Sequence, residues 1–340
     1  MSNPASPKLS RSFTADKNPQ GIAFLDSRWM VVANDFGETI SLIDRVSGQT
    51  TSIPVEFEPG LKGLDVSAVA FDAAQSRLYV LLSALNAIAA FDVDLTKDPP
   101  VFTAKGRLAS AWWPSAISVL SDGSLAVTSL RGKGIGPLLE YADIGDGEGS
   151  SQMRGAIQKM AAPTDADFTA GTQMVAQAVA VGARPGYPTL SCDGGEKDFP
   201  VPETNTEGPS PHIQHIFFVV RENKTFDSLL GDLPNVEGDP QYAMKLTSEE
   251  MDRIWTNFRE LGKSFTMSDN FYNLAIKSTQ GHQWTTHGRT TDFCERTWSL
   301  DSRQVPLCGV ASPGKPVEGS LFDWLVNNSV PFDILGEIVG

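Results

Sequence analysis

The chain of 340 residues has room for two domains, at roughly 150 residues per domain. Its formal net charge of -14 argues against nucleic acid or an anionic membrane as a partner, because like charges repel. No run of about 18 apolar residues occurs, so we expect no transmembrane segment. The polar residues 1–8 show no signal peptide.

The first part of the chain is a succession of short apolar runs separated by turns. A first copy contains Gly21–Phe24, Trp29–Ala33 and Thr39–Asp44. A second copy contains Ser67–Phe71, Arg77–Leu82 and Ala87–Asp92, and a third contains Ser115–Val119 and Ser124–Thr128. Runs of this length, rich in β-branched residues and bounded by Gly, Asp and Asn, are typical of strands.

The copies recur at a nearly constant spacing. Phe24 and Phe71 are 71 − 24 = 47 positions apart, and Phe71 and Val119 are 119 − 71 = 48 apart. A repeat of about 40 to 50 residues with several strands is typical of a β-propeller blade. The copies resemble YVTN-type propeller repeats, in which a strand closes on Asp, as at Asp44 and Asp92. Residues 1–150 are therefore predicted to form a partial propeller of about three blades.

Residues 151–211 are predicted to connect this propeller to a second domain. Thr164 or Asp165 is expected to cap a helix. Its predicted apolar side consists of Phe168, Met174, Val175 and Val179, and it is expected to end near Gly182. The stretch from there to Pro211 is rich in Pro, Gly, Ser and Thr, which is typical of a linker. The loop after the third copy is expected to leave Arg131 and Lys133 facing solvent.

The second domain is predicted to begin at residue 212. His215–Val220 is an apolar run of strand length, and Phe226–Leu230 has the pattern of a short helix between a Thr225 cap and Gly231. Glu222 and Asn223 lie between them, at the strand end where ligands bind in open α/β sheets. Their oxygens suit a divalent cation, although such a run is also typical of an ordinary polar loop.

The run IQHIFFVVRENKTFDSLLGD (residues 213–232) resembles the opening motif of the phosphoesterase family that holds phospholipases C and acid phosphatases. That family belongs to the alkaline phosphatase superfamily. The resemblance places a metal-site role on Glu222 and Asn223 and implies one or more divalent metal ions. Lys224 stands where Arg is commoner in the family. Residues 212–340 are therefore predicted to be the N-terminal half of an α/β alkaline-phosphatase-like domain.

A second block resembles bacterial fusions of a YVTN propeller with such a phosphatase domain. It comprises Ser268–Tyr272, Lys277–Trp284 and the stretch from Thr290 to Trp298. The resemblance implies hydrolysis of phosphate mono- or diesters through a covalent Ser or Thr phospho-enzyme. Ser278 is the expected nucleophile, with Thr279 as the rival, and His282 is expected to contact the phosphate or the leaving group. Ser278 is also compatible with a plain helix cap, and His287 with a packing or surface role.

The resemblance also sets expectations about the whole protein. We expect this sequence to be shortened at both ends, to hold at most half a metal site and to have little activity. The fusions that it resembles are mostly exported, which indicates a periplasmic or extracellular location. The three cysteines permit one disulfide, Cys294–Cys308, in an oxidising compartment, and they are at least as compatible with unpaired thiols.

Two other functions are compatible with parts of the sequence. The propeller could recruit a protein partner while the second domain is inert, because fold alone does not settle function. A quinoprotein-like redox enzyme is a further possibility, since propellers host such cofactors. Residues 1–150 contain no histidine or cysteine, and nothing there supports that last interpretation.

Overall fold

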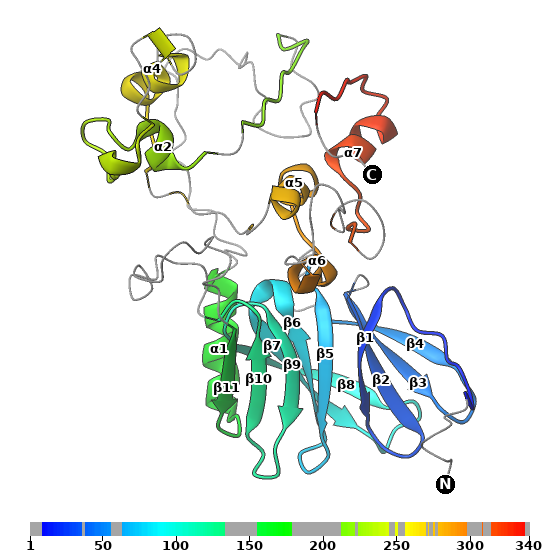
Figure 1. Cartoon of the computed structure of the whole chain (residues 1–340). Coiled ribbons are helices and arrows are strands. Elements are labelled where there is room, and N and C mark those ends of the chain that lie inside the picture. The colour runs from blue at the N-terminus through cyan, green and yellow to red at the C-terminus, as the bar shows by residue number, and fades with distance from the viewer. Residues whose placement is uncertain are drawn as a thin grey trace, which may run out of the picture. The chain divides into compact units, whose positions relative to one another are not determined.

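The sheets dominate the N-terminal half of the structure (Figure 1). A computed structural model describes residues 9–35, 38–55, 63–132, 155–178, 212–221, 224–244, 249–250, 256–269, 271, 275, 278–297, 308 and 314–336. The chain divides into two compact units, one comprising residues 1–185 and 274–340 and the other residues 186–273. Among the described residues, no helix is long and apolar enough to cross a bilayer.

Three antiparallel sheets follow one another along the chain, and their strands confirm the predicted copies. The first sheet has the order β1-β2-β3-β4, the second β5-β6-β7-β8 and the third β11-β10-β9. The strand bounds are β1 Pro19–Phe24, β2 Trp29–Asn34, β3 Thr39–Asp44, β4 Thr50–Pro54, β5 Val66–Asp72, β6 Arg77–Leu82, β7 Ala87–Asp94, β8 Val101–Ala109, β9 Pro114–Val119, β10 Leu125–Ser129 and β11 Ala156–Met160. A 3-10 turn, η1 Ser83–Leu85, links β6 to β7. Because β11 pairs with β10, the third sheet continues beyond residue 150 into the predicted connector.

A residue with a positive φ angle directly precedes the first strand of each of the three sheets. Asn18, Asp65 and Trp113 have positive φ values of 48°, 50° and 56° and directly precede β1, β5 and β9. The carbonyl of each accepts a backbone N–H from just beyond the second strand, at 3.1, 3.0 and 2.9 Å. We call this end of the sheets the entry end. Its residues are 65 − 18 = 47 and 113 − 65 = 48 positions apart, which repeats the spacing found in the sequence.

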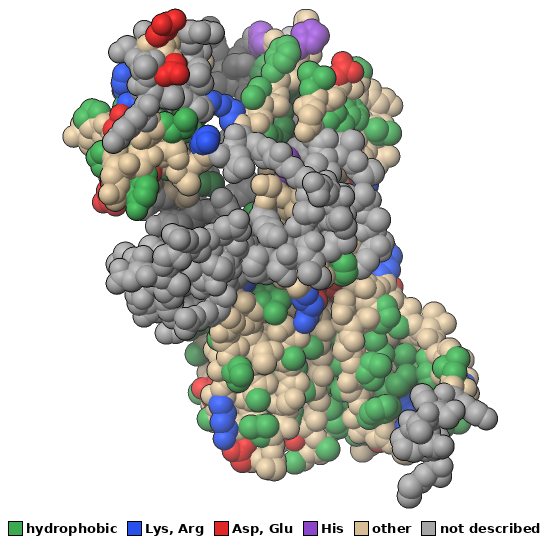
Figure 2. Space-filling view, in the orientation of Figure 1, with side chains coloured by type: hydrophobic (Ala, Val, Ile, Leu, Met, Phe, Trp, Pro, Cys, Tyr) green, Lys and Arg blue, Asp and Glu red, His purple; other side chains and the backbone are tan. Residues whose placement is uncertain are grey.

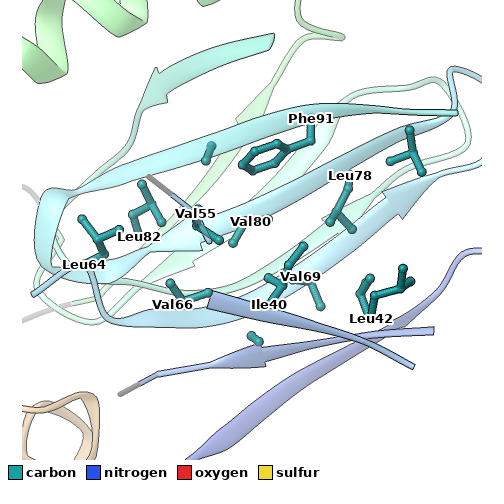
Figure 3. Packing of buried hydrophobic residues seen from close by; sticks show 14 of the residues in the cluster. Ile40, Leu42, Val55, Leu64, Val66, Val69, Leu78, Val80, Leu82 and Phe91 are labelled. Atoms are coloured by element: carbon teal, nitrogen blue, oxygen red, sulfur yellow. The ribbon is translucent and has the colours of Figure 1, made fainter. Parts of the chain in front are cut away.

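The second sheet is packed on both faces. Alternate residues of β6 point to opposite sides, as expected for a pleated strand. Leu78, Val80 and Leu82 join the cluster shared with the first sheet, shown in Figure 3, and Tyr79 and Leu81 join the cluster shared with the third. β5 lies between β1 and β9, so the first strands of the three sheets are neighbours.

Helix α1 (Asp165–Ala178) packs along β8. Thr164 begins it, since the Thr164 hydroxyl accepts the Asp167 N–H at 3.3 Å while the Asp167 carboxylate accepts the Thr164 N–H at 2.8 Å. Phe168 enters the cluster between the second and third sheets, and Val175 enters the cluster between the first and second. The predicted cap is thus confirmed, as are Phe168 and Val175 on the apolar side. Met174 is exposed instead, Val179 lies outside the described residues, and the described helix ends at Ala178.

Close contact between α1 and β8 requires glycine at position 171. A Cβ at Gly171 would collide with the Arg107 carbonyl and the Leu108 Cα. Alanine normally favours a helix interior, but here we expect Gly171→Ala to lower the free energy of unfolding by about 1–3 kcal/mol. Gly281→Ala is the matched control, because its Cβ would meet only an ordinary contact at 3.6 Å. Urea denaturation of both variants tests this; a Gly171→Ala protein as stable as wild type would contradict it.

The far face of the first sheet is covered by the segment 9–18. Phe13 and Ala15 pack on Met30, Val32 and Ile43. The Asp16 carboxylate accepts hydrogen bonds from the hydroxyls of Thr39 and Ser52, at 3.0 and 3.1 Å. Ile22 and Phe24 of β1 remain exposed beside this cover.

The second unit contains α2 (Phe226–Leu230), η4 (Pro240–Tyr242) and α4 (Thr256–Ser264). The predicted helix is confirmed: Thr225 caps α2 through the Ser228 N–H, and Gly231 is its C-cap. Arg259 of α4 ties the helices together, donating to the Leu229 carbonyl at 2.8 Å and to Asp232 at 2.7 Å.

The predicted strand at His215–Val220 does not form. Residues 213–221 have no regular secondary structure, and the side chains from Ile216 to Val220 are exposed, Phe217 by 90%. A strand requires a partner for its backbone hydrogen bonds, and no described strand pairs with this run. The α/β sheet predicted for this region is therefore not seen among the described residues.

Candidate active site

Ser278 and His282 lie on one short helix, α5 (Ser278–His287). Ser278 is its first residue and is exposed, and His282, four residues later, is half-buried. Positions i and i+4 of a helix are neighbours on one face, so the two side chains are about 5–6 Å apart at Cβ. The rival Thr279 is buried, with 4% of its surface exposed. Solvent therefore reaches Ser278 and not Thr279.

The predicted metal ligands Glu222 and Asn223 lie outside the described residues, so their role remains a prediction. The described part of the chain contains no group of three His, Cys, Asp or Glu side chains placed to hold a metal ion. The case for a metal ion therefore rests on the chemistry of Glu222 and Asn223. Their side-chain oxygens are ligands of the kind that divalent cations prefer.

Polar side chains hold α5 in place. Its buried residues are Thr279, Gln280, Gln283 and Thr286. Gln283 accepts the Thr290 hydroxyl at 2.7 Å and donates to the Gly314 carbonyl. Gln280 donates to Glu295 at 2.5 Å. His287 has a packing role, as anticipated, with its Nδ1 2.9 Å from the Thr286 hydroxyl.

Helix α6 (Asp292–Thr297) is fastened to the entry end of the sheets. The Trp113 indole donates to Asp292 at 3.0 Å, and Arg296 donates to the Ser115 carbonyl at 3.0 Å. Just before the helix, Arg289 pairs with Asp65, one of the three positive-φ residues. Helix α7 (Leu321–Asn327) follows, with Ser320 and Asp323 forming a capping box. Within this unit, the segment carrying Ser278 is thus fixed to the sheets.

Arg131 does not face solvent as predicted. Its side chain is 4% exposed, lies 5.8 Å from the Trp113 ring centroid and pairs with Glu295 of α6. An arginine in a charged, Gly-rich loop is normally exposed to solvent. Here the arginine is buried because it pairs with the buried Glu295, which is 164 residues away in the sequence. Lys133 lies outside the described residues. Sequence reasoning missed Arg131, Asp65 and Glu295, because only the fold brings them together.

Burial shifts the acids at this junction toward their neutral forms. Burial raises the pKa of Glu295 to about 7, although Arg131 and Gln280 oppose the shift. Burial, with help from Asp292, raises the pKa of Asp35 to about 7 against Asn18, Arg289 and Arg296. Burial also holds the pKa of Asp65 well above its usual range.

These shifts predict that the first unit loses stability as pH rises. With raised pKa values, the folded state keeps protons that the unfolded chain releases between about pH 4 and 7, so the free energy of unfolding falls across that window. Each pKa unit of difference corresponds to about 1.4 kcal/mol. Urea midpoints at about pH 5 and 8 measure the slope, and Glu295→Gln is expected to flatten it. A midpoint that rises with pH in both proteins would contradict the prediction.

Cys294 and Cys308 form a disulfide, with their Cα atoms 5.4 Å apart. The bond joins α6 to a residue 14 positions later. The one pairing that the sequence permits is therefore seen, in place of the unpaired thiols that are equally compatible with it. Both cysteines are buried, and the disulfide reinforces the segment that contacts the sheets.

Several solved structures of β-propeller proteins are similar to part of this chain. Virginiamycin B lyase from Staphylococcus aureus is 14% identical over 44% of this chain and 43% of its own, with a TM-score of 0.26. Aldose sugar dehydrogenase from Streptomyces coelicolor is 18% identical over 45% and 48%, with a TM-score of 0.31. The chain thus spans less than half the length of either protein. No family model and no curated protein matches the sequence.

The successive antiparallel sheets, with β1, β5 and β9 as neighbouring first strands, have the arrangement of a partial β-propeller. Each sheet is accordingly a blade. The blade surface in view in Figure 2 carries scattered hydrophobic side chains and few charged ones. The charged side chains near the candidate site, Asp65, Arg131 and Glu295, are instead buried at the entry end.

Proposed function

We propose that this chain carries the nucleophile of a metal-dependent hydrolase of phosphate mono- or diesters. The main support is the exposed Ser278 hydroxyl at the start of α5, with His282 one turn later. These residues lie in the block that resembles propeller–phosphatase fusions. The N-terminus of a helix favours a bound anion, because its free N–H groups and its dipole attract negative charge.

In the proposed reaction, the Ser278 Oγ attacks phosphorus. The Oγ–P bond forms as the bond from phosphorus to the leaving oxygen breaks, and the hydroxyl proton departs with the alcohol. Water then cleaves the phosphoserine, releasing phosphate from a monoester or a phosphomonoester from a diester. His282, one turn away, contributes by contacting the phosphoryl oxygens or the leaving group.

Glu222 and Asn223 are the proposed metal ligands in this chain. A bound divalent ion would supply positive charge against the charge that develops on the phosphoryl oxygens. The chain's own residues supply the nucleophile and orient the ester. The proposal therefore separates into two testable parts, the hydroxyl of Ser278 and the oxygens of the Glu-Asn pair.

The test is hydrolysis of p-nitrophenyl phosphate and bis(p-nitrophenyl) phosphate with added Mg²⁺, Mn²⁺, Zn²⁺ or Ca²⁺. The Glu222→Gln protein and a chelator are the controls, and peptide mass spectrometry reports any phosphoryl group on Ser278. Slow hydrolysis that requires the metal and Glu222, with phosphoserine at position 278, is the expected result. Absence of both hydrolysis and phosphoserine with every metal would overturn the proposal and favour a propeller-based binding protein.

A further inference from the structure

Both carboxylate oxygens of Glu295 are occupied, each by a different part of the fold. Oε1 accepts the Gln280 side-chain amide of α5 at 2.5 Å, and Oε2 accepts the Arg131 guanidinium of the third blade. The three residues are 0%, 2% and 4% exposed in the order Gln280, Glu295, Arg131. A continuous buried chain of hydrogen bonds therefore runs from the blade to a point two residues after Ser278.

This polar chain matters because α5 has no apolar anchor among its buried residues, which are two threonines and two glutamines. Apolar packing is non-directional and tolerates small shifts of a helix. Hydrogen bonds weaken steeply with distance and angle, so they fix its position more narrowly. The groups that Gln280 and Gln283 contact therefore help to fix the position of α5, beside the half-buried Trp284 and the contact with α7.

We infer that Glu295 and Arg131 are positioning residues, which hold Ser278 in place by fixing the start of α5 to the third blade. On this inference the propeller is a structural part of the catalytic unit. The inference rests on the proposed function, in which Ser278 is the nucleophile. Arg131 is buried at the blade and reaches α5 through Glu295 and Gln280.

Removal of the arginine takes away the hydrogen-bond donor at Oε2 of Glu295, so the link between α5 and the blade loosens. A nucleophile displaced by about 1 Å costs on the order of a hundredfold in rate. We therefore expect Arg131→Met to lower kcat by about ten- to a hundredfold. KM should change much less, because Arg131 does not touch the ester.

The experiment compares Arg131→Met, Glu295→Gln and Arg77→Met in the whole chain. Arg77→Met is the matched control: Arg77 is a buried arginine of the second blade, paired with Asp92 at 2.8 Å, and contacts neither α5 nor α6. Amide hydrogen exchange of residues 278–287 reports the position of α5, and kcat and KM report catalysis. Arg131→Lys keeps the charge and should restore part of kcat.

Faster exchange in α5 together with the drop in kcat, in Arg131→Met but not in Arg77→Met, is the expected result. Wild-type exchange and kcat in Arg131→Met would overturn the inference, as would faster exchange with unchanged kcat. If Arg131→Met does not fold, Glu295→Gln decides by the same two readouts. Should the wild-type chain show no turnover at all, the proposed function fails, and unchanged α5 exchange would separately reject the link to the blade.

Discussion

Ser278→Ala is expected to reduce phosphoester hydrolysis by on the order of a thousandfold or more, because the variant lacks the atom that attacks phosphorus. The phosphoryl group on the peptide containing residue 278 should disappear with it. Ser278 is exposed at the start of α5, so the loss of its hydroxyl should leave the fold intact. Initial rates under the metal conditions that support wild-type hydrolysis measure the effect.

Two neighbouring hydroxyls serve as comparisons for Ser278. Thr285 is exposed on the same helix, with its hydroxyl bonded to the Gly281 carbonyl at 2.9 Å, and Thr285→Ala should leave turnover unchanged. Thr279→Ala removes the rival hydroxyl, which is buried, and should lower the rate far less than Ser278→Ala. A reversal, with an active Ser278→Ala protein and an inactive Thr279→Ala protein, would transfer the nucleophile to Thr279.

Phe168→Ala is expected to lower the free energy of unfolding by about 3–5 kcal/mol. Phe168 is 2% exposed and packs among residues of the second and third blades, and the Arg77 guanidinium lies 5.1 Å from its ring centroid. Alanine would leave a cavity where α1 meets the blades. For a unit of this size, the melting temperature should fall by about 10 °C.

Met174→Ala on the same helix is the control for Phe168→Ala. Met174 is 57% exposed, so its truncation should change stability by no more than about 0.5 kcal/mol. Thermal unfolding followed by circular dichroism gives both values. Equal melting temperatures for the two variants would show that α1 does not brace the blades.

Local sequence features predict most of the propeller. The first three strands of the first two blades and their spacing follow from alternating apolar runs and turn residues, and the turns at Asp26 and Asp72 recur with the copies. The outer strands β4, β8 and β11 are not among the predicted runs, because exposed residues interrupt their apolar pattern and β11 also follows a long insertion after β10. The run at residues 216–220 was predicted as a strand and is not one. Its residues have high β propensity, but no described strand pairs with them.

The candidate site was predictable only where the chemistry is local. Ser278 and His282 lie four residues apart, so their shared helix could be expected from the sequence. The support beneath them joins residues about 160 to 220 positions apart, such as Arg131 with Glu295 and Asp65 with Arg289. No periodicity in the sequence links such distant residues. Taken alone, each of these charged side chains would be expected to face solvent.

The segment 9–18 has a consequence for self-association. Stacked sheets are prone to add further copies through any bare apolar face. Phe13 and Ala15 shield Met30, Val32 and Ile43 from a second molecule. The cover is partial, because Ile22 and Phe24 of β1 stay exposed beside it, so contact between copies at this end of the blades would fall on those two side chains.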